Sequence, residues 1–160
     1  MVRVLRITIL VFVFSNSPLN YLSAWALPDD VVYNTGASSL EEAGSSSANI
    51  RFAPCPDNIE RFCGTVVEIV NPEDPPGPDV MPDGKPVIGY PIIRGLKDKG
   101  DGKFRKGKII AMDESLEKGK IVTYDIKIDD NFDGTLKVKG CLGPICPRTM
   151  IWRAVSETTP

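Results

Sequence analysis

Apolar and polar residues alternate along much of the chain, with the spacing that is typical of β-strands. The clearest run spans residues 121–129, where every second side chain from Val122 to Ile128 is apolar and those between are polar. Comparable apolar or alternating runs occupy residues 50–53, 64–70, 87–96, 108–112, 135–140 and 148–155. No helical period of any length appears after residue 26. The pattern predicts an all-β fold of about seven strands, a small antiparallel up-and-down barrel with its apolar face inside.

Proline, glycine and small polar residues mark the connections and the domain limits. Residues 72–86 hold six of the fourteen prolines, a content that no ladder strand tolerates, so we expect a long surface loop there. Residues 113–119 predict a turn. Residues 27–49 are rich in Ser, Gly and Ala and only weakly patterned, which predicts a flexible N-terminal arm. The barrel domain is therefore expected over residues 50–155, followed by a tail at 156–160.

The first 26 residues have the features of a cleavable signal helix. Arg3 and Arg6 give a short positive region, residues 7–14 form an apolar run, and Ala24-Trp25-Ala26 fits a small-x-small cleavage pattern. An apolar run of this length cannot cross a bilayer, which needs about 20 residues. We therefore expect cleavage after Ala26, a periplasmic or secreted protein, and no membrane span in the mature form.

Composition narrows the functional classes. The chain contains no histidine, so it has no Ser-His-Asp triad, no Cys-His pair and no imidazole metal ligand. Its net charge is −2, and loss of a leader with two arginines would make the mature chain more acidic still. That balance is not the basic footprint of a nucleic-acid binder. We expect a monomer with no catalytic residues, no cofactor, no bound metal and no nucleic-acid partner.

Four cysteines lie in the expected mature chain, which fits an oxidising compartment. They allow three pairings, and the short spacings favour Cys55 with Cys63 and Cys141 with Cys146, each pair closing its own turn. Each bond would contribute about 2–3 kcal/mol by loop closure. The alternative, a four-thiolate zinc site, lacks the usual closely spaced cysteine pairs.

Several motifs follow one another along the chain: Ile50–Cys55, Phe62–Val67, Pro86–Gly89 with Ile93–Leu96, Gly107–Ile110, Gly119-Lys120 with Tyr124, Leu136–Gly143 and Thr149–Arg153. Taken in this order, they resemble one bacterial family, the domain-of-unknown-function family 2147. The resemblance covers about residues 49–155. It implies a small exported protein with a lipocalin-like barrel.

A lipocalin-like barrel implies that its inner face could hold a small apolar or amphipathic ligand, although inward side chains can equally fill a core. The residues expected to line such a site are Tyr124, Ile126, Val138, Met150 and Trp152. Tyr124 and Trp152 are the most informative, because each adds a polar group to an apolar wall.

The alternative function is a cell-envelope interaction module that binds another protein or a cell-wall polymer through its loops. The loop at 72–86 and the basic run at 97–108 are the candidate contacts. A solvated, soluble surface explains the basic run most simply. Residues 129–134 resemble the start of a calcium loop, but Gly140 stands where a bidentate Glu is needed, so a solvated hairpin tip explains them better.

Overall fold

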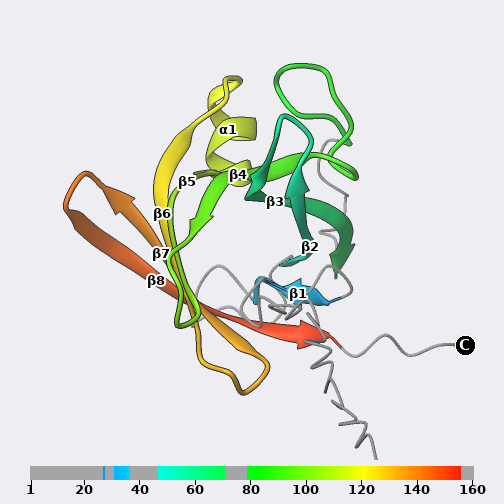
Figure 1. Ribbon diagram of the computed structural model, residues 1–160. Helices are drawn as coiled ribbons and strands as arrows, with labels where there is room; N and C mark the ends of the chain where they lie inside the picture. Colours follow the sequence, from blue (N-terminus) through cyan, green and yellow to red (C-terminus); the bar gives the residue numbers. More distant parts are fainter. Residues whose placement is uncertain (1–26, 28–30, 37–46, 71–78, 156–160) are drawn as a thin grey trace, which may run out of the picture.

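The computed structural model describes residues 27, 31–36, 47–70 and 79–155, which form eight strands and one short helix (Figure 1). Their bounds are β1 Val32–Asn34, β2 Ser47–Cys55, β3 Asn58–Val70, β4 Pro91–Asp98, β5 Lys103–Ile110, α1 Met112–Lys118, β6 Thr123–Asp130, β7 Thr135–Leu142 and β8 Ile145–Val155. Each strand pairs antiparallel with the next, and β1 also pairs with β8, so the sheet closes into a barrel. The predicted all-β antiparallel barrel is confirmed.

Apolar side chains from all eight strands meet inside the barrel, including Tyr33 of β1. Those that are at most 1% exposed are Ile50, Phe52, Val66, Ile93, Leu96, Phe104, Ile126, Ile128, Leu136, Val138 and Trp152. Burying one such side chain stabilises a fold by about 1.5–3 kcal/mol. The alternation seen in the sequence therefore corresponds to one continuous core.

The barrel begins earlier in the chain than the sequence indicates. Residues 27–49 were expected to form an arm, but Val32–Asn34 is β1 and β2 starts at Ser47. The side-chain Nδ2 of Asn34 donates to Asn49 Oδ1 (2.8 Å), and the side-chain Nδ2 of Asn49 donates to Glu68 Oε2 (2.7 Å). These hydrogen bonds link β1, β2 and β3. Because β1 is only three residues long and is held in part by polar side chains, its sequence is too short to show the apolar alternation that predicts a strand.

Leu27 is also part of the core, because only 1% of its surface is exposed. The expected signal helix (1–26), most of the expected arm (28–30 and 37–46) and the tail (156–160) lie outside the described residues. So does the proline-rich centre of the long loop at 71–78. The second half of that loop packs inward, since Met81, Val87 and Tyr90 are buried.

Helix α1 replaces the turn that the sequence predicts at 113–119. Gly119 ends the helix in the left-handed conformation (φ 61°) and donates to the Leu116 carbonyl. The Ser115 hydroxyl is buried, donates to the Ala111 carbonyl and accepts from the Val122 amide, which fixes the helix to the strand that follows it. Seven residues are too short for a helical period to stand out. No described helix is long and apolar enough to cross a membrane.

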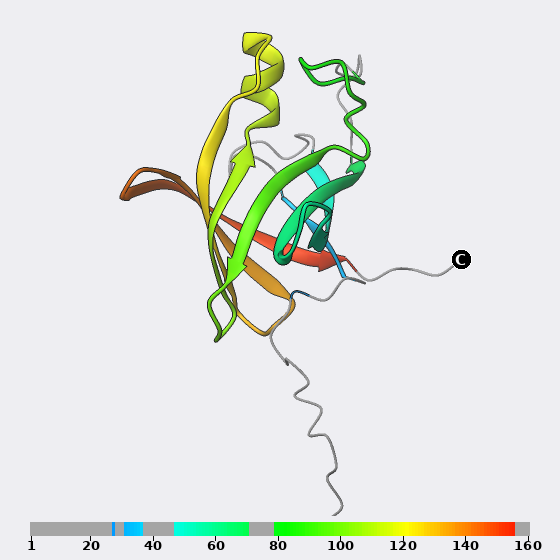
Figure 2. The ribbon, with the colours of Figure 1, turned by 45° about the horizontal axis from the view of Figure 1, so that its top comes forward.

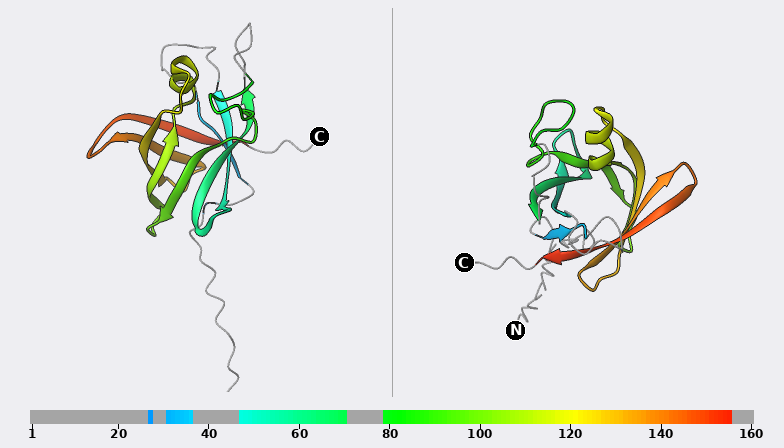
Figure 3. Two further views of the ribbon diagram at one scale, coloured as in Figure 1. Left: turned by 90° about the horizontal axis from the view of Figure 1, so that it is seen from above. Right: turned by 180° about the vertical axis from the view of Figure 1, so that it is seen from behind.

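The strand directions place the connections at two ends of the barrel. Helix α1 and the 79–90 segment lie at one end, which we call the α1 end (Figure 2). Strand direction also joins β7 to β8 on this side, although their hairpin projects sideways. The tips of β2–β3, β4–β5 and β6–β7 lie at the other end. The β7–β8 hairpin, orange to red, extends away from the rest of the barrel in every view (Figure 3).

Candidate functional site at the α1 end of the barrel

Strand register brings the five residues expected to contact a ligand onto one wall. Tyr124 and Ile126 lie on β6, Val138 on β7, and Met150 and Trp152 on β8. Directly opposed residues on antiparallel strands share a face, and Val138 lies opposite Met150. Because Val138 and Trp152 are fully buried, this wall is the inner face of β6–β8.

Burial divides these five residues into two groups. Ile126, Val138 and Trp152 are at most 1% exposed and belong to the packed core. Tyr124 and Met150 are only partly buried. The first three residues therefore pack in the core, whereas Tyr124 and Met150 have exposed surface that another molecule could contact.

Two inward-facing glycines show where the interior is full and where it is open. A Cβ built on Gly107 would lie 2.8 Å from two Leu96 carbons and 3.0 Å from an Ile126 methyl, so that region has no spare space. Among the described residues, a Cβ on Gly140 would have only the Arg148 Cβ within 4 Å, at 3.9 Å. The inner wall is therefore open at Gly140.

Gly140 and Arg148 belong to this open part of the wall, and sequence reasoning did not select them. Gly140 lies opposite Ile126 on one side and opposite Arg148 on the other. Arg148 is exposed although it shares the face of Met150 and Trp152. The sequence does contain a signal for this opening, because a glycine and an arginine interrupt the apolar alternation at inward positions of β7 and β8.

A polar cluster on α1 borders the opening. The Tyr124 hydroxyl donates to Glu114 Oε2 (2.5 Å), and Lys118 pairs with the other oxygen of Glu114. The hydrogen bonds from Lys118 and Tyr124 hold the pKa of the Glu114 carboxyl below its usual value, and the charge of Arg148 acts in the same direction. The hydrogen bond to Glu114 raises the pKa of the Tyr124 hydroxyl. The rim of the opening thus carries charged groups of both signs.

Trp152 contributes a buried polar atom below the opening. Its indole Nε1 has no hydrogen-bond partner among the described residues. Its ring lies 6.4 Å from the ring of Phe52 on β2, measured between centroids. Buried donors are normally paired, so this N–H is able to donate one further hydrogen bond.

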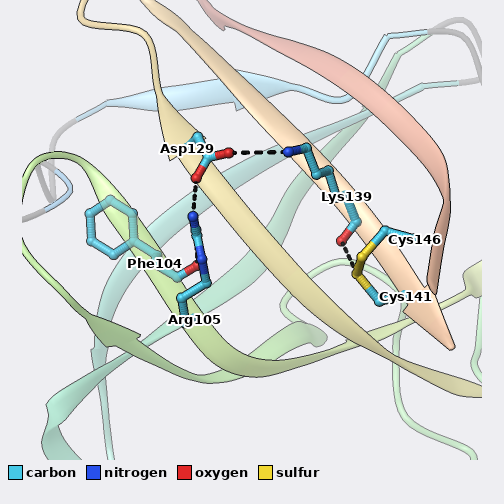
Figure 4. The surroundings of a disulfide bond; sticks show 6 residues. All are labelled: Phe104, Arg105, Asp129, Lys139, Cys141 and Cys146. Atoms are coloured by element: carbon cyan, nitrogen blue, oxygen red, sulfur yellow. Dashed lines mark hydrogen bonds and ion pairs between the residues drawn. A yellow bond between two sulfur atoms is a disulfide. The ribbon is translucent and has the colours of Figure 1, made fainter. Parts of the chain in front are cut away.

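A disulfide fixes the β7–β8 hairpin that carries half of this wall. Cys141 and Cys146 are bonded, as are Cys55 and Cys63 at the β2–β3 tip, so the expected pairing is confirmed. On the outer face beside the first bond, Asp129 bridges Arg105 on β5 and Lys139 on β7 (Figure 4). These links hold β5, β6 and β7 together on the side of the β6–β7 tip.

The acidic segment at 129–134 is a hairpin tip between β6 and β7. Asp130 accepts from the Phe132 amide, and Asp133 accepts from the amide and hydroxyl of Thr135. These carboxylates therefore accept hydrogen bonds within the turn and stabilise it. Within the described residues no group of three metal-ligating side chains converges.

Comparison with known proteins agrees with this architecture. The family model described as "Uncharacterized protein conserved in bacteria (DUF2147)" matches residues 38–154. The structure of protein HP1028 from the human pathogen Helicobacter pylori, described as belonging to the lipocalin family, is similar with a TM-score of 0.59 and 15% sequence identity. The match covers 82% of this chain and 86% of that chain. No curated protein matches this sequence.

Proposed function

This chain belongs to the bacterial DUF2147 family, and on that premise we propose that it is a non-catalytic binding protein for a small amphipathic molecule. Its lipocalin-like barrel supports the proposal, because barrels of this size can hold one small ligand at an open end. Fold alone does not decide function, so the argument rests on the site.

The observation that carries the proposal is the open inner wall at Gly140. The missing side chain leaves space between Ile126 and Arg148, and Met150 lies one inward position further along β8. Apolar surface that remains accessible beside a packed core favours occupation by the apolar part of a ligand.

The charged rim supports an amphipathic ligand over a wholly apolar one. Among the described residues no carboxylate lies within 4 Å of Arg148. A guanidinium suits the carboxylate or phosphate head of a single-chain amphiphile. The head would lie at Arg148 and the chain against Met150 and the Gly140 wall, with no bond made or broken.

Two further features support the same role in an extracytoplasmic compartment. The disulfides are typical of oxidising environments, and the N-terminal sequence has the features of a signal peptide.

The experiment is extraction of the protein from its native host. The processed protein is purified, extracted with organic solvent, and the extract is analysed by mass spectrometry beside that of the Gly140→Leu variant. We expect one amphiphile at near-stoichiometric amount in the parent and its loss in the variant, whose added side chain fills the opening. An empty parent, or equal amounts in both proteins, would show that this wall is not the binding site.

A second candidate function, an envelope interaction module, is favoured by the β7–β8 tip. Leu142 and Ile145 are 61% and 68% exposed, and the disulfide between Cys141 and Cys146 fixes their turn. Exposed aliphatic side chains on a rigid projection are typical of contact surfaces. Crosslinking from this tip in the native host would test it, and a single stoichiometric protein partner lost in the Leu142→Ser variant would favour this function.

A further inference from the structure

A second hollow lies on the outside of the barrel, along β3, β4 and β5. It is an open groove of about 750 Å³, which we call the outer groove. The β2–β3 tip at Cys55–Asn58 borders it on one side, and Lys106 and Lys108 of β5 border it on the other. Its position outside the barrel wall makes it independent of the opening at Gly140.

Basic side chains dominate the outer groove. Arg61, Arg94, Lys106 and Lys108 line it, and Asp57 is the only acid among the described residues that line it. Arg94 and Lys108 lie opposite each other on β4 and β5, so their Cβ atoms are about 5 Å apart. They also line an adjoining hollow of about 360 Å³ near the α1 end.

Most of these charges are not neutralised within the protein. Lys108 pairs with Asp125 at 2.7 Å. Arg61 and Arg94 donate instead to the carbonyl oxygens of Gly95 (3.2 Å) and Pro91 (3.3 Å), which are neutral acceptors. In the part of the chain that the structure describes, no carboxylate lies within 4 Å of Arg61, Arg94 or Lys106.

The backbone at Lys106 is a second, independent observation. Lys106 adopts a left-handed conformation (φ 64°) where the β5–β6 register shifts. The neighbouring strand β4 meets the same need with a glycine, Gly95, at φ 70°. A lysine here is less favourable than glycine by about 1 kcal/mol, and such outliers collect at functional sites. The lysine at this position adds a charge to the groove that a glycine would not supply.

The chemistry of the lining narrows the ligand. Where the structure describes the chain, no aromatic side chain lines the outer groove, so these residues offer no platform on which a nucleic-acid base would stack. The acidic net charge of the chain also disfavours nucleic acid. Arginine forks and lysine ammonium groups along a channel suit several oxyanions presented in a row.

From this arrangement we propose that the outer groove binds an oligoanion, a ligand with several phosphate or carboxylate groups spaced along a chain. Arg94 and Lys106 provide charges that no carboxylate of the described residues neutralises, and Arg61 adds a third beside the β2–β3 tip. The oxyanions could belong to a polyphosphate or to an acidic saccharide, and the two are separated experimentally.

The test is calorimetric titration at 150 mM salt with two probes, tripolyphosphate and trigalacturonate. The parent is compared with Arg94→Gln/Lys106→Gln and with a control of equal charge, Lys97→Gln/Lys120→Gln, whose lysines are exposed and lie outside the groove. We expect saturable binding of at least one probe, weakened at least tenfold by the groove variant and less than twofold by the control. The probe that binds more tightly identifies the source of the oxyanions.

Two results would overturn the proposal: no saturable binding of either probe, or equal weakening in both double variants, which would indicate general charge attraction. Lys106→Gly separates binding from folding, because it removes the ammonium group and relieves the left-handed backbone. We expect it to weaken binding severalfold with no loss of melting temperature. Retained affinity in this variant would also contradict the proposal. Gly140→Leu should leave these titrations unchanged, so the outcome is independent of the ligand site inside the barrel.

Discussion

The two inward glycines provide a direct test of where the barrel is packed and where it is open. The same change, glycine to alanine, is made at Gly107 and at Gly140. Neither residue has a positive φ, so an alanine imposes no backbone strain at either position. Any difference between the two variants therefore reports the space around the added methyl group.

The structure sets opposite expectations for the two variants. At Gly107 the methyl would lie 2.8 Å from Leu96 carbons, and overpacking of this kind costs about 1–3 kcal/mol. At Gly140 the nearest atom is 3.9 Å away, which is ordinary contact. Replacing a strand glycine without a clash stabilises a protein by about 0.4–1 kcal/mol, because the unfolded chain loses freedom.

The assay is urea unfolding of both variants and the parent, with the disulfides intact. We expect the free energy of unfolding to fall by about 2 kcal/mol for Gly107→Ala and to stay equal or rise for Gly140→Ala. Equal stability of Gly107→Ala and the parent would refute the packed interior. A loss above about 1 kcal/mol for Gly140→Ala would refute the open wall.

Three further predictions concern the stability of the barrel. Leu27→Ala should lower the free energy of unfolding by about 2–5 kcal/mol, because Leu27 is fully buried; denaturation that matches the parent would place it outside the core. Replacing Cys141 and Cys146 by serine should cost about 2 kcal/mol and leave far-UV circular dichroism unchanged, whereas a lost β-sheet spectrum would mean the bond is needed for folding. For Asp129, burial opposes ionisation, but the hydrogen bond and charge of Arg105 outweigh it and hold the pKa of the carboxyl below its usual value. The ionised carboxylate therefore stabilises the fold by about 1 kcal/mol above its unfolded-state pKa, and this stabilisation is lost as pH falls through its pKa in the folded protein. The difference in free energy of unfolding between the parent and Asp129→Asn should therefore close between pH 7 and pH 2, and a constant difference would contradict this.

The long strands could be predicted because apolar residues, which are buried, alternate with polar residues along them. On β6 and β7, the apolar positions of the sequence are the buried positions of the structure, from Ile126 to Val138. The disulfides followed from spacing, because short loops hold each pair close. These features are local, so one stretch of sequence contains the information.

The elements that the sequence did not predict depend on distant contacts or are too short to show a pattern. Strand β1 is held by its partners on β2 and β8, and Leu27 is buried although the residues after it carry no apolar period. Helix α1 is stabilised by Ser115 contacts and a glycine cap, which a seven-residue pattern does not reveal.

The candidate site was predicted in part for the same reason. The inner face was correctly located, but its division into filled and open regions depends on which residues of neighbouring strands lie opposite each other. Gly140 is an opening only because Ile126 and Arg148 flank it across β6 and β8. The register between strands therefore determines which part of the inner face is packed and which part is accessible, and the apolar pattern of one strand does not contain this information.

The central claim, that the wall at Gly140 binds an amphiphile, is tested most directly by titration of a dansyl-labelled undecanoate. The parent and Gly140→Leu are titrated after solvent extraction and followed by dansyl fluorescence, with unfolding measured on the same samples. We expect saturable one-site binding in the parent and at least tenfold weaker binding in the variant, at unchanged stability. Equal affinity in the two proteins, or no saturable binding in the extracted parent, would contradict the account.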